Sequence, residues 1–301
     1  MAWWKAWVEQ EGISVKGSPH FNPEPDAETL YKAMKGIGTN EQALIDVLTK
    51  RSSLQRQQIA KAFKAQFGKD LTETLKSELS GNFEKVMVAL MYPPYRYEAK
   101  ELHDAMKGIG TKEGVIIEIL ASRTKSQLQE IMKAYEEDYG SSLEEDIRAD
   151  TSGYLERVLV CLLQGSRDDV SRVVDPALAL QDAQDLYAAV FEEYEKIAGK
   201  SIEDSIKSET HGSLEQAMLT VVKCTRNLHS YFAERLYRAM KGLGTHDRTL
   251  IRIIVSRSEI DLNLIKCQFQ KMYGKTLSSM ITGDTSGDYK NALLNLVGRE
   301  S

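Results

Sequence analysis

The sequence has few of the features that mark secreted, nucleic-acid-binding or metal-cysteine proteins. Among 301 residues there are three cysteines, six prolines and five histidines, and the formal net charge is −5. The cysteines lie far apart in apolar segments, so we expect free thiols rather than a zinc site. A negatively charged chain has no overall attraction for nucleic acid or for an anionic membrane. An acidic partner must be reached through local lysines or a bridging cation.

Long apolar runs and catalytic signatures are also missing. No apolar stretch reaches the roughly 18 residues of a membrane span. Charges at Lys5, Glu9 and Glu11 interrupt the region where a signal peptide must be apolar. We therefore expect a cytoplasmic protein. The histidines are scattered and no nucleophile elbow, P-loop or zinc signature occurs, so we do not expect an enzyme.

A unit of about 70 residues recurs along the chain and is its dominant pattern. Each complete copy opens with Leu-x-x-Ala-Met-Lys-Gly-x-Gly-Thr. An Ile/Leu/Val-rich segment, a basic residue before Ser or Thr, an aromatic-glycine pair and a final apolar segment follow. The copies divide the chain into an N-terminal arm at residues 1–20, repeat I at 21–92, repeat II at 93–164, repeat III at 177–223 and repeat IV at 227–298.

The spacing of apolar residues indicates helices throughout. Apolar positions recur at intervals of three and four, as in the run from Ala43 to Leu48, and no segment alternates as a strand would. This pattern predicts an all-α protein of short helices. In each Met-Lys-Gly-x-Gly-Thr loop, the glycines can end one helix and Thr39, Thr111 or Thr245 can cap the next, with Gln42 completing a capping box after Thr39.

Repeat III is shorter than the others. Its acid Glu209 follows the opening Leu186 at about half the distance that separates Glu78 from Leu30 in repeat I. A segment that includes the glycine loop and about two helices is therefore missing. The position 42 residues before Glu209 is Arg167, where the sequence has no such loop. We expect no cation site in this repeat.

Each of the three loops is followed by an acidic residue 42 positions after its first glycine. Glycine permits the backbone angles that let successive carbonyls converge, and a distant carboxylate adds charge. Ca²⁺ takes six to eight oxygen ligands, which such a loop and acid can supply. The predicted ligands are the carbonyls of Met34, Gly36 and Gly38 with Glu78; of Met106, Gly108 and Gly110 with Asp150; and of Met240, Gly242 and Gly244 with Asp284.

A single copy of this loop would indicate only a helix stop followed by a helix start. Three copies with a fixed separation from an acid favour a cation site, and no EF-hand loop is present. Lipid phosphate could complete the calcium shell and link an acidic protein to an acidic membrane. Loop lysines and apolar tip residues would face that membrane. These residues are Lys35, Ile37, Lys107, Ile109, Lys241 and Leu243.

The Met-Lys-Gly-x-Gly-Thr loops with their acids resemble those of the annexin family, from about residue 21 to the end. The resemblance implies four repeats of five helices in a curved disc whose convex face carries the calcium loops. It implies Ca²⁺-dependent binding to membranes rich in phosphatidylserine, anticoagulant behaviour, and movement from the cytosol to plasma or endosomal membranes. It also relates Thr39 and Glu41 to accessory calcium sites, and Glu101, Arg123 and Arg252 to a central pore, for which a buried ion network is the simpler interpretation.

Repeat III departs from the family pattern. Its bundle cannot close in the family's manner, which predicts reduced stability or self-association of a protein otherwise expected to be monomeric. A second hypothesis is a helical scaffold for actin or a small EF-hand protein, with impaired membrane docking. Trp3, Trp4 and Trp7 share one face if residues 2–11 are helical, and this face could pack on the disc or enter a partner's groove.

Overall fold

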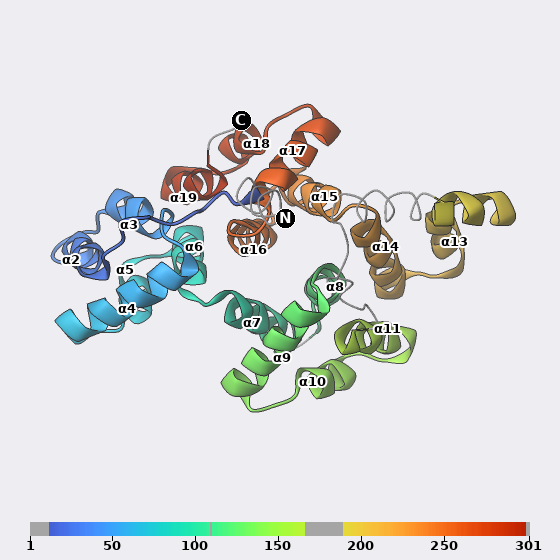
Figure 1. The fold of residues 1–301 in the computed structure, drawn as a ribbon, viewed down its shortest axis with the longest axis horizontal. Helices are drawn as coiled ribbons and strands as arrows, with labels where there is room; N and C mark the ends of the chain where they lie inside the picture. The colour runs from blue at the N-terminus through green and yellow to red at the C-terminus, as the bar shows by residue number, and fades with distance from the viewer. Residues whose placement is uncertain (1–11, 109, 166–188, 299–301) are drawn as a thin grey trace, which may run out of the picture. The chain divides into compact units, whose positions relative to one another are not determined.

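The computed structural model describes residues 12–108, 110–165 and 189–298, and within these ranges the chain is helical without strands (Figure 1). The all-α prediction is confirmed. Residues 189–198 form a helix that we call helix 189–198. The other helices are α2 (Pro23–Met34), α3 (Glu41–Leu48), α4 (Ser53–Phe67), α5 (Leu71–Glu78), α6 (Gly81–Met91), α7 (Pro94–Met106), α8 (Glu113–Ser122), α9 (Lys125–Tyr139), α10 (Leu143–Asp150), α11 (Gly153–Gln164), α13 (Ile202–Glu209), α14 (Gly212–Arg226), α15 (Leu228–Met240), α16 (Asp247–Arg257), α17 (Leu262–Tyr273), α18 (Leu277–Asp284) and α19 (Gly287–Val297).

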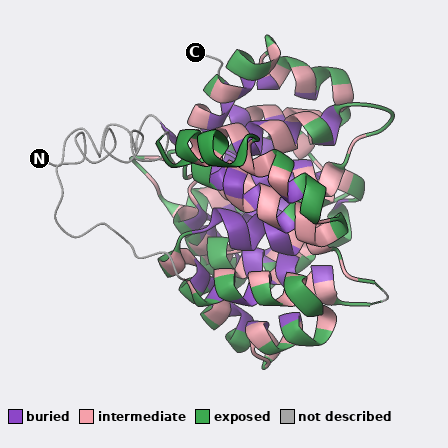
Figure 2. Ribbon diagram, turned by 90° about the vertical axis from the view of Figure 1, so that its right-hand side faces the viewer, coloured by how far each residue is buried: buried purple, intermediate pink, exposed green. Residues whose placement is uncertain are grey.

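The chain forms two compact units. Unit 1 joins its two ends, Met1–Tyr97 and His229–Ser301, and unit 2 is the continuous stretch Glu98–Leu228. In both units the buried residues gather on inward helix faces and the exposed residues cover the outer turns (Figure 2). None of the helices in the described ranges combines the length and apolarity that a membrane crossing requires.

In unit 1, α6 of repeat I packs against α16 and α19 of repeat IV, while α2 lies along α4. Leu30, Phe63 and Phe269 are fully buried there. A partly buried ion pair adds to this contact between repeats, because Nη2 of the buried Arg56 lies 2.8 Å from Oε1 of Glu259. The first and last repeats are therefore joined by both apolar packing and charge.

The segment before repeat I crosses the same contact. The backbone N–H groups of Ser14 and Val15 donate to the carbonyl of Ser258 at 2.9 and 3.0 Å. The N–H of Ser18 donates to Oε1 of Gln55 at 3.0 Å, and Nε2 of Gln55 donates to the Ser18 carbonyl at 2.8 Å. Residues 14–18 thus hydrogen-bond to repeats I and IV together.

Unit 2 is built on repeat II. Its core contains Ile116, Ile131, Tyr135 and Leu159, and Ala217 of α14 belongs to the same cluster. Helix α14 packs against α8 and α11, and α13 packs against α14. The described helices of repeat III are thus attached to repeat II mainly through α14.

Local sequence explains several helix ends. Ser52 with Gln55 and Thr124 with Gln127 form capping boxes at the starts of α4 and α9. Gly68 closes α4 in the left-handed conformation, where a residue with a Cβ would be strained.

The prediction that the loop threonines cap the following helices is wrong. Helix α3 is capped by Asn40, whose side chain accepts from the N–H of Ala43 at 3.1 Å. Helices α8 and α16 begin after Lys112 and His246, neither of which makes a side-chain cap. The threonine hydroxyls donate to a different acceptor, described below.

A buried carboxylate supports the turn before α17. Oδ1 of Asp261 accepts from Nε of Arg257 at 2.7 Å, and Oδ2 lies 3.2 Å from Nε2 of His229. Burial alone would raise the pKa of Asp261, but hydrogen bonds from His229 and Arg257 outweigh burial and lower this pKa from 3.8 to about 2.

We expect Asp261 to contribute about 2 kcal/mol of stability at neutral pH. Because its folded pKa is depressed, this contribution is present above the unfolded pKa of about 3.9 and is lost as the pH falls towards about 2. Urea unfolding of wild type and Asp261→Asn, followed at pH 7 and pH 3, measures it. The stability gap between the two proteins should be smaller at pH 3, and a gap that does not depend on pH would contradict the assignment.

Candidate calcium-binding loops

The three glycine loops begin where a long helix ends. Helices α2, α7 and α15 end at Met34, Met106 and Met240, so the first predicted carbonyl ligand of each loop belongs to a last helical residue. The carbonyls of a helix C-terminus have no partner within the helix. They are therefore available to a ligand beside the loop.

One backbone hydrogen bond closes each loop in the same way. The N–H of the residue after the loop threonine donates to a carbonyl in the last turn of the preceding helix. The pairs are Asn40 to Ala33 at 2.8 Å, Lys112 to Ala105 at 2.9 Å, and His246 to Ala239 at 2.8 Å. This bond folds each loop back over its own helix end.

The glycines are required by backbone angle rather than by space. Gly36 and Gly38 have φ values of 111° and 85°, and the equivalent glycines of the other two loops lie within a few degrees of these values. A Cβ at these positions would contact nothing within 4 Å, so the constraint is the left-handed conformation itself. The same conformation recurs in repeats I, II and IV.

The structure brings the predicted acid of each repeat to its loop. Glu78, Asp150 and Asp284 are the last residues of the eight-residue helices α5, α10 and α18. The loop threonine hydroxyl donates to the acid, and the pairs are Thr39 to Glu78 at 3.5 Å, Thr111 to Asp150 at 2.6 Å, and Thr245 to Asp284 at 2.6 Å. Sequence reasoning missed this role because threonine before a helix also fits a cap.

These positions concentrate negative potential. A helix C-terminus carries a partial negative charge, and a carboxylate there is electrostatically unfavourable by about 0.3–1 kcal/mol. Each loop brings together two helix C-termini and one such carboxylate, so a bound cation would relieve their repulsion. Among the described residues, no group of three or more His, Cys, Asp or Glu side chains could hold a metal ion. Backbone carbonyls at the helix ends and the carboxylate are the oxygen donors that these loops bring together, and such donors suit a hard cation such as Ca²⁺.

A hollow of roughly 520 Å³ lies beside the loop of repeat I. Tyr31, Met34, Gly36 and Glu78 line it, so two of the three residues with predicted carbonyl ligands and the acidic residue border one space. Lys35 also borders this space. The hollow is large enough for an ion together with part of a second oxygen-bearing molecule.

The loop tips carry apolar side chains that face solvent. Ile37 and Leu243 are fully exposed, at 109% and 108%. Nζ of Lys35 lies 5.6 Å from the ring centre of Tyr31, and Lys241 has the same relation to Tyr237 at 5.4 Å. Cation–π contact keeps these lysines beside their loops. Ile109, the tip residue of repeat II, lies outside the described residues.

In repeats I, II and IV, the arginine that precedes a Ser or Thr contacts the helix that leads into the glycine loop. Nε of Arg51 donates to Asp26 at 2.6 Å, and Nε of Arg123 donates to Glu98 at 2.6 Å. In repeat IV, the guanidinium of Arg257 instead lies 4.8 Å from the ring centre of Phe232. Each contact fixes the early turns of α2, α7 or α15.

The charged positions that the resemblance relates to a pore are buried. Glu101, Arg123 and Arg252 are 5%, 3% and 1% exposed. Arg123 pairs with Glu98 as described, in agreement with the interpretation that it belongs to a buried ion network.

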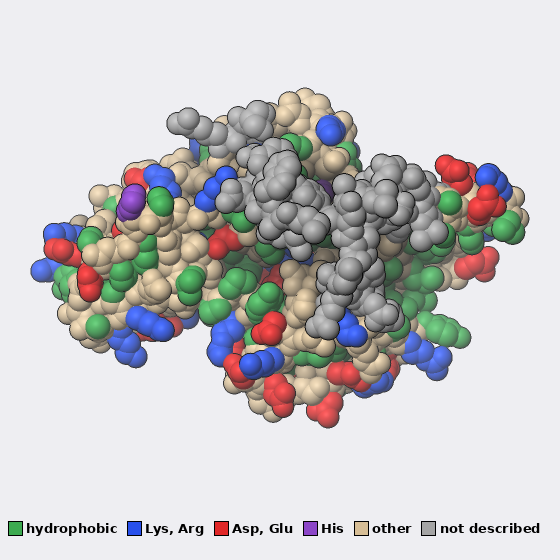
Figure 3. All heavy atoms as spheres, viewed as in Figure 1, with side chains coloured by type: hydrophobic (Ala, Val, Ile, Leu, Met, Phe, Trp, Pro, Cys, Tyr) green, Lys and Arg blue, Asp and Glu red, His purple; other side chains and the backbone are tan. Residues whose placement is uncertain are grey.

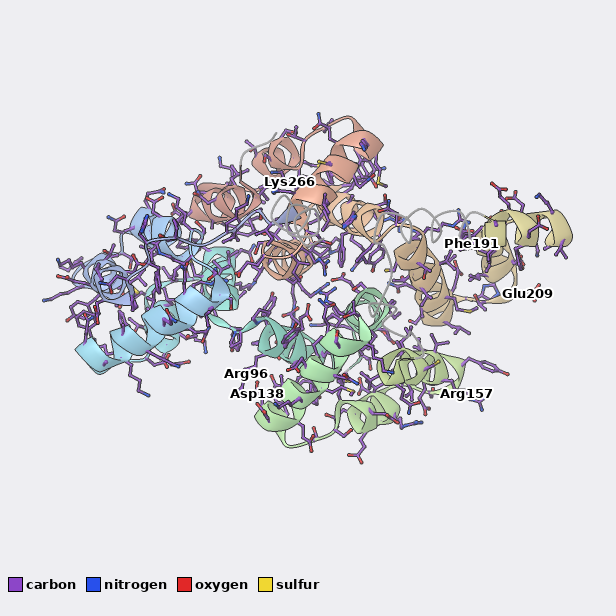
Figure 4. The ribbon with its side chains drawn as sticks, in the orientation of Figure 1. Arg96, Asp138, Arg157, Phe191, Glu209 and Lys266 are labelled. Atoms are coloured by element: carbon purple, nitrogen blue, oxygen red, sulfur yellow. The ribbon has the colours of Figure 1, made fainter. Side chains whose placement is uncertain are left out.

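Repeat III keeps the acid. Glu209 ends α13, and the hydroxyl of Thr210 donates to the carbonyl of Ile206 at 2.7 Å, as Thr151 and Thr285 do at the ends of α10 and α18. Figure 4 shows Glu209 at the turn between α13 and α14. Arg167, at the position where the loop would start, lies outside the described residues. The end of α13 is therefore built as in the other repeats, but the sequence of repeat III lacks the glycine loop.

Comparison with known proteins places this geometry in a family. Annexin A8-like protein 1 of Homo sapiens is 81% identical over 326 residues, with full coverage of both chains. The structure of the K16A mutant of annexin A8 matches with a TM-score of 0.87 and 80% identity, covering 96% of this chain and 98% of that one. Calcium-bound annexin (Sm)1 matches with a TM-score of 0.80 and 34% identity, covering 95% and 93%.

The family described as Annexin matches four stretches of the chain, residues 25–90, 97–162, 181–221 and 231–296. These stretches include the three loops, the three acids and Glu209. The match extends over most of the sequence and agrees with the helical repeats of the structure. On these grounds, the chain belongs to the annexin family.

Proposed function

We propose that this protein binds anionic phospholipid membranes through Ca²⁺ held at the loops of repeats I, II and IV. The annexin family is known for Ca²⁺-dependent phospholipid binding, and its members are generally membrane-binding proteins rather than enzymes. The observation that carries the proposal is the contact between the loop threonine and the acid, which recurs at equivalent positions in three repeats.

The proposed ligands in each repeat are three loop carbonyls and one carboxylate. They are Met34, Gly36, Gly38 and Glu78; Met106, Gly108, Gly110 and Asp150; and Met240, Gly242, Gly244 and Asp284. Bound Ca²⁺ would supply the positive charge that links these oxygens to lipid phosphate. Lys35, Lys107 and Lys241 add attraction to anionic headgroups, and Ile37, Ile109 and Leu243 enter the interface between headgroups and acyl chains.

The finer parts of the proposal rest on family resemblance. We propose phosphatidylserine as the preferred lipid, plasma or endosomal membranes as the location when Ca²⁺ rises, and an anticoagulant effect through covering procoagulant lipid. The Trp-rich start most resembles the member called vascular anticoagulant beta, whereas the relatives named above are annexin A8 proteins.

We also propose that repeat III is incomplete. The family match is much shorter there, at 181–221, than in the other repeats, at 25–90, 97–162 and 231–296. Burial in the helix at residues 189–198 supports the same conclusion. Val190 is 59% exposed, whereas Ile59, Ile131 and Ile265, each also nine residues before the glycine that follows its helix, are buried.

This deficit keeps a second candidate function open, a helical scaffold for actin or a small EF-hand protein with impaired membrane docking. The N-terminal tryptophans proposed to contact such a partner lie outside the described residues. Replacing all three by alanine would abolish that complex if they form its interface, and unchanged partner binding would exclude it.

Co-sedimentation with phosphatidylserine and phosphatidylcholine vesicles over a calcium titration tests the main proposal. We expect the protein to pellet with the serine lipid, to require Ca²⁺, and to be released by a chelator. A folded protein that stays in solution at all calcium concentrations would overturn the proposal and favour the scaffold.

Neutralising one acid should weaken calcium binding in proportion to the sites lost. Glu78→Gln, Asp150→Asn and Asp284→Asn should each raise the Ca²⁺ concentration for half-maximal pelleting by roughly three- to tenfold, because each removes a charged ligand. The triple variant should not pellet. Glu209→Gln is the matched control, since it neutralises the equivalent acid where no loop is present. An equal effect of the control would contradict the assignment.

The loop tips should contribute affinity without contributing to folding. Ile37→Ser and Leu243→Ser should each lower vesicle affinity by about tenfold at saturating Ca²⁺, since burying an aliphatic side chain is worth about 1.5–3 kcal/mol. Thermal unfolding in chelator should not change, because both side chains are exposed. Leu54→Ser, at an exposed leucine on α4, serves as control and should bind like wild type.

A further inference from the structure

The acid of repeat I is held less closely by its loop than the acids of repeats II and IV. The hydroxyl oxygen of Thr39 lies 3.5 Å from Oε2 of Glu78. This distance is beyond the range of about 2.5–3.0 Å that is usual for an O–H···O hydrogen bond. In repeats II and IV the corresponding distance to Oδ2 is 2.6 Å, for the pairs Thr111 with Asp150 and Thr245 with Asp284.

The threonine hydroxyl of repeats II and IV also reaches the backbone of the acid. Oγ1 of Thr111 lies 3.2 Å from the carbonyl oxygen of Asp150. Oγ1 of Thr245 lies 3.2 Å from the carbonyl oxygen of Asp284. One hydroxyl therefore contacts the main chain and the side chain of the same residue. This contact restricts the torsions of an aspartate, which has one fewer rotatable bond than the glutamate of repeat I.

The residue after the acid differs between the repeats in the same way. The hydroxyls of Thr151 and Thr285 donate at 2.6 Å to the carbonyls of Ile147 and Ile281, in the last turns of α10 and α18. In repeat I this position is Leu79, which has no hydroxyl and is buried. The helix end that carries the acid is thus tied by a side-chain hydrogen bond in repeats II and IV, whereas in repeat I this position can contribute only apolar packing.

The acids also differ in their exposure to water. Glu78 is exposed, whereas Asp150 and Asp284 are partly buried. A hydrogen bond to a carboxylate, and the attraction of that carboxylate for a cation, are both stronger where less water surrounds it. On the face drawn in Figure 3, basic and acidic side chains are interspersed in both units. Local contacts and burial, rather than charge gathered on that face, therefore distinguish the repeats.

A carboxylate that is oriented before the ion arrives binds it with a smaller loss of conformational entropy. Hydrogen bonds that orient a metal ligand typically account for about 10- to 100-fold in metal affinity. The threonine does not block the ion, because two carboxylate oxygens offer about four lone-pair sites and the hydroxyl uses one of them. Orientation by threonine should thus favour Ca²⁺ binding.

We infer that the three calcium sites are unequal, and that Thr111 and Thr245 are positioning residues that give repeats II and IV a higher Ca²⁺ affinity than repeat I. Repeats II and IV then fill first as the Ca²⁺ concentration rises, and repeat I fills last. The inference rests on the proposed function, because it requires that the loops bind Ca²⁺. It adds which residues set the affinity of each loop.

Proteins that keep a single calcium site test the order of filling. Asp150→Asn with Asp284→Asn leaves repeat I, Glu78→Gln with Asp284→Asn leaves repeat II, and Glu78→Gln with Asp150→Asn leaves repeat IV. Calorimetric titration with calcium chloride, without lipid, should give dissociation constants for repeats II and IV that are about tenfold lower than for repeat I. Circular dichroism in chelator verifies that each variant folds. Equal constants, or tightest binding at repeat I, would overturn the inference.

Removing the threonine hydroxyl tests the positioning role. In the protein that keeps repeat II, Thr111→Val should raise the Ca²⁺ dissociation constant by roughly tenfold, and Thr111→Ser should keep the original value. Thr39→Val in the protein that keeps repeat I is the matched control, and its constant should change by less than about twofold because its contact is long. A threonine with only a structural role would lower the melting temperature in chelator and leave the constant unchanged. That result, tighter binding, or an equal effect of the control would contradict the inference.

Exchanging the acids tests the inference in the opposite direction. Glu78→Asp gives repeat I the acid of the other two repeats, so its Ca²⁺ dissociation constant should fall by about threefold, and Asp150→Glu should raise that of repeat II. Absence of both effects would overturn the inference. A wild-type protein that takes up no Ca²⁺, with or without vesicles, would instead overturn the proposed function. Equal sites in a protein that still pellets with vesicles would overturn only the inference.

Discussion

The site depends on bringing together groups that repel one another. Each loop joins the C-terminal end of one helix to a carboxylate at the C-terminal end of another, so partial and full negative charges converge. One threonine hydroxyl and one backbone hydrogen bond hold this arrangement, as the 2.6 Å contact of Thr245 with Asp284 and the 2.8 Å contact of His246 with Ala239 show. The fold is thereby prepared for a cation, because the helix packing already opposes the repulsion that an ion would relieve.

The packing that holds these groups is local to each repeat. The free energy of membrane binding, in contrast, would be the sum of the contributions of the repeats that carry a loop. Arg51 and Arg123 each bind a carboxylate at the start of the helix that leads into the loop, and Arg257 uses an aromatic ring instead. Different chemistry therefore fixes the same helix in repeat IV. What is preserved between repeats is the direction of the helix end and the backbone of the loop, rather than every contact that supports them.

The positions of the loops and acids could be predicted from sequence because the helices between them have fixed lengths. A constant spacing between loop and acid places Glu78, Asp150 and Asp284 at the ends of α5, α10 and α18. The role of the threonines could not be predicted, since a hydroxyl before a helix suits both a backbone cap and a carboxylate, and only tertiary packing decides between them. The exposure of Val190 could not be predicted either. An apolar residue at this position indicates a core side chain, but its burial depends on helices elsewhere in the chain.

The arrangement of unit 1 has a consequence for how the protein is made. Ser14 and Ser258 are 244 residues apart in sequence, yet they are hydrogen-bonded, and α6 packs on helices of the last repeat. Contacts of such separation slow folding, because a long chain segment must be ordered before they form. On the ribosome, repeat I has to wait for repeat IV with the apolar face of α6 uncovered. Unit 2 is continuous in sequence and can fold first, so the interval before termination is when the chain is most exposed to aggregation and to chaperones.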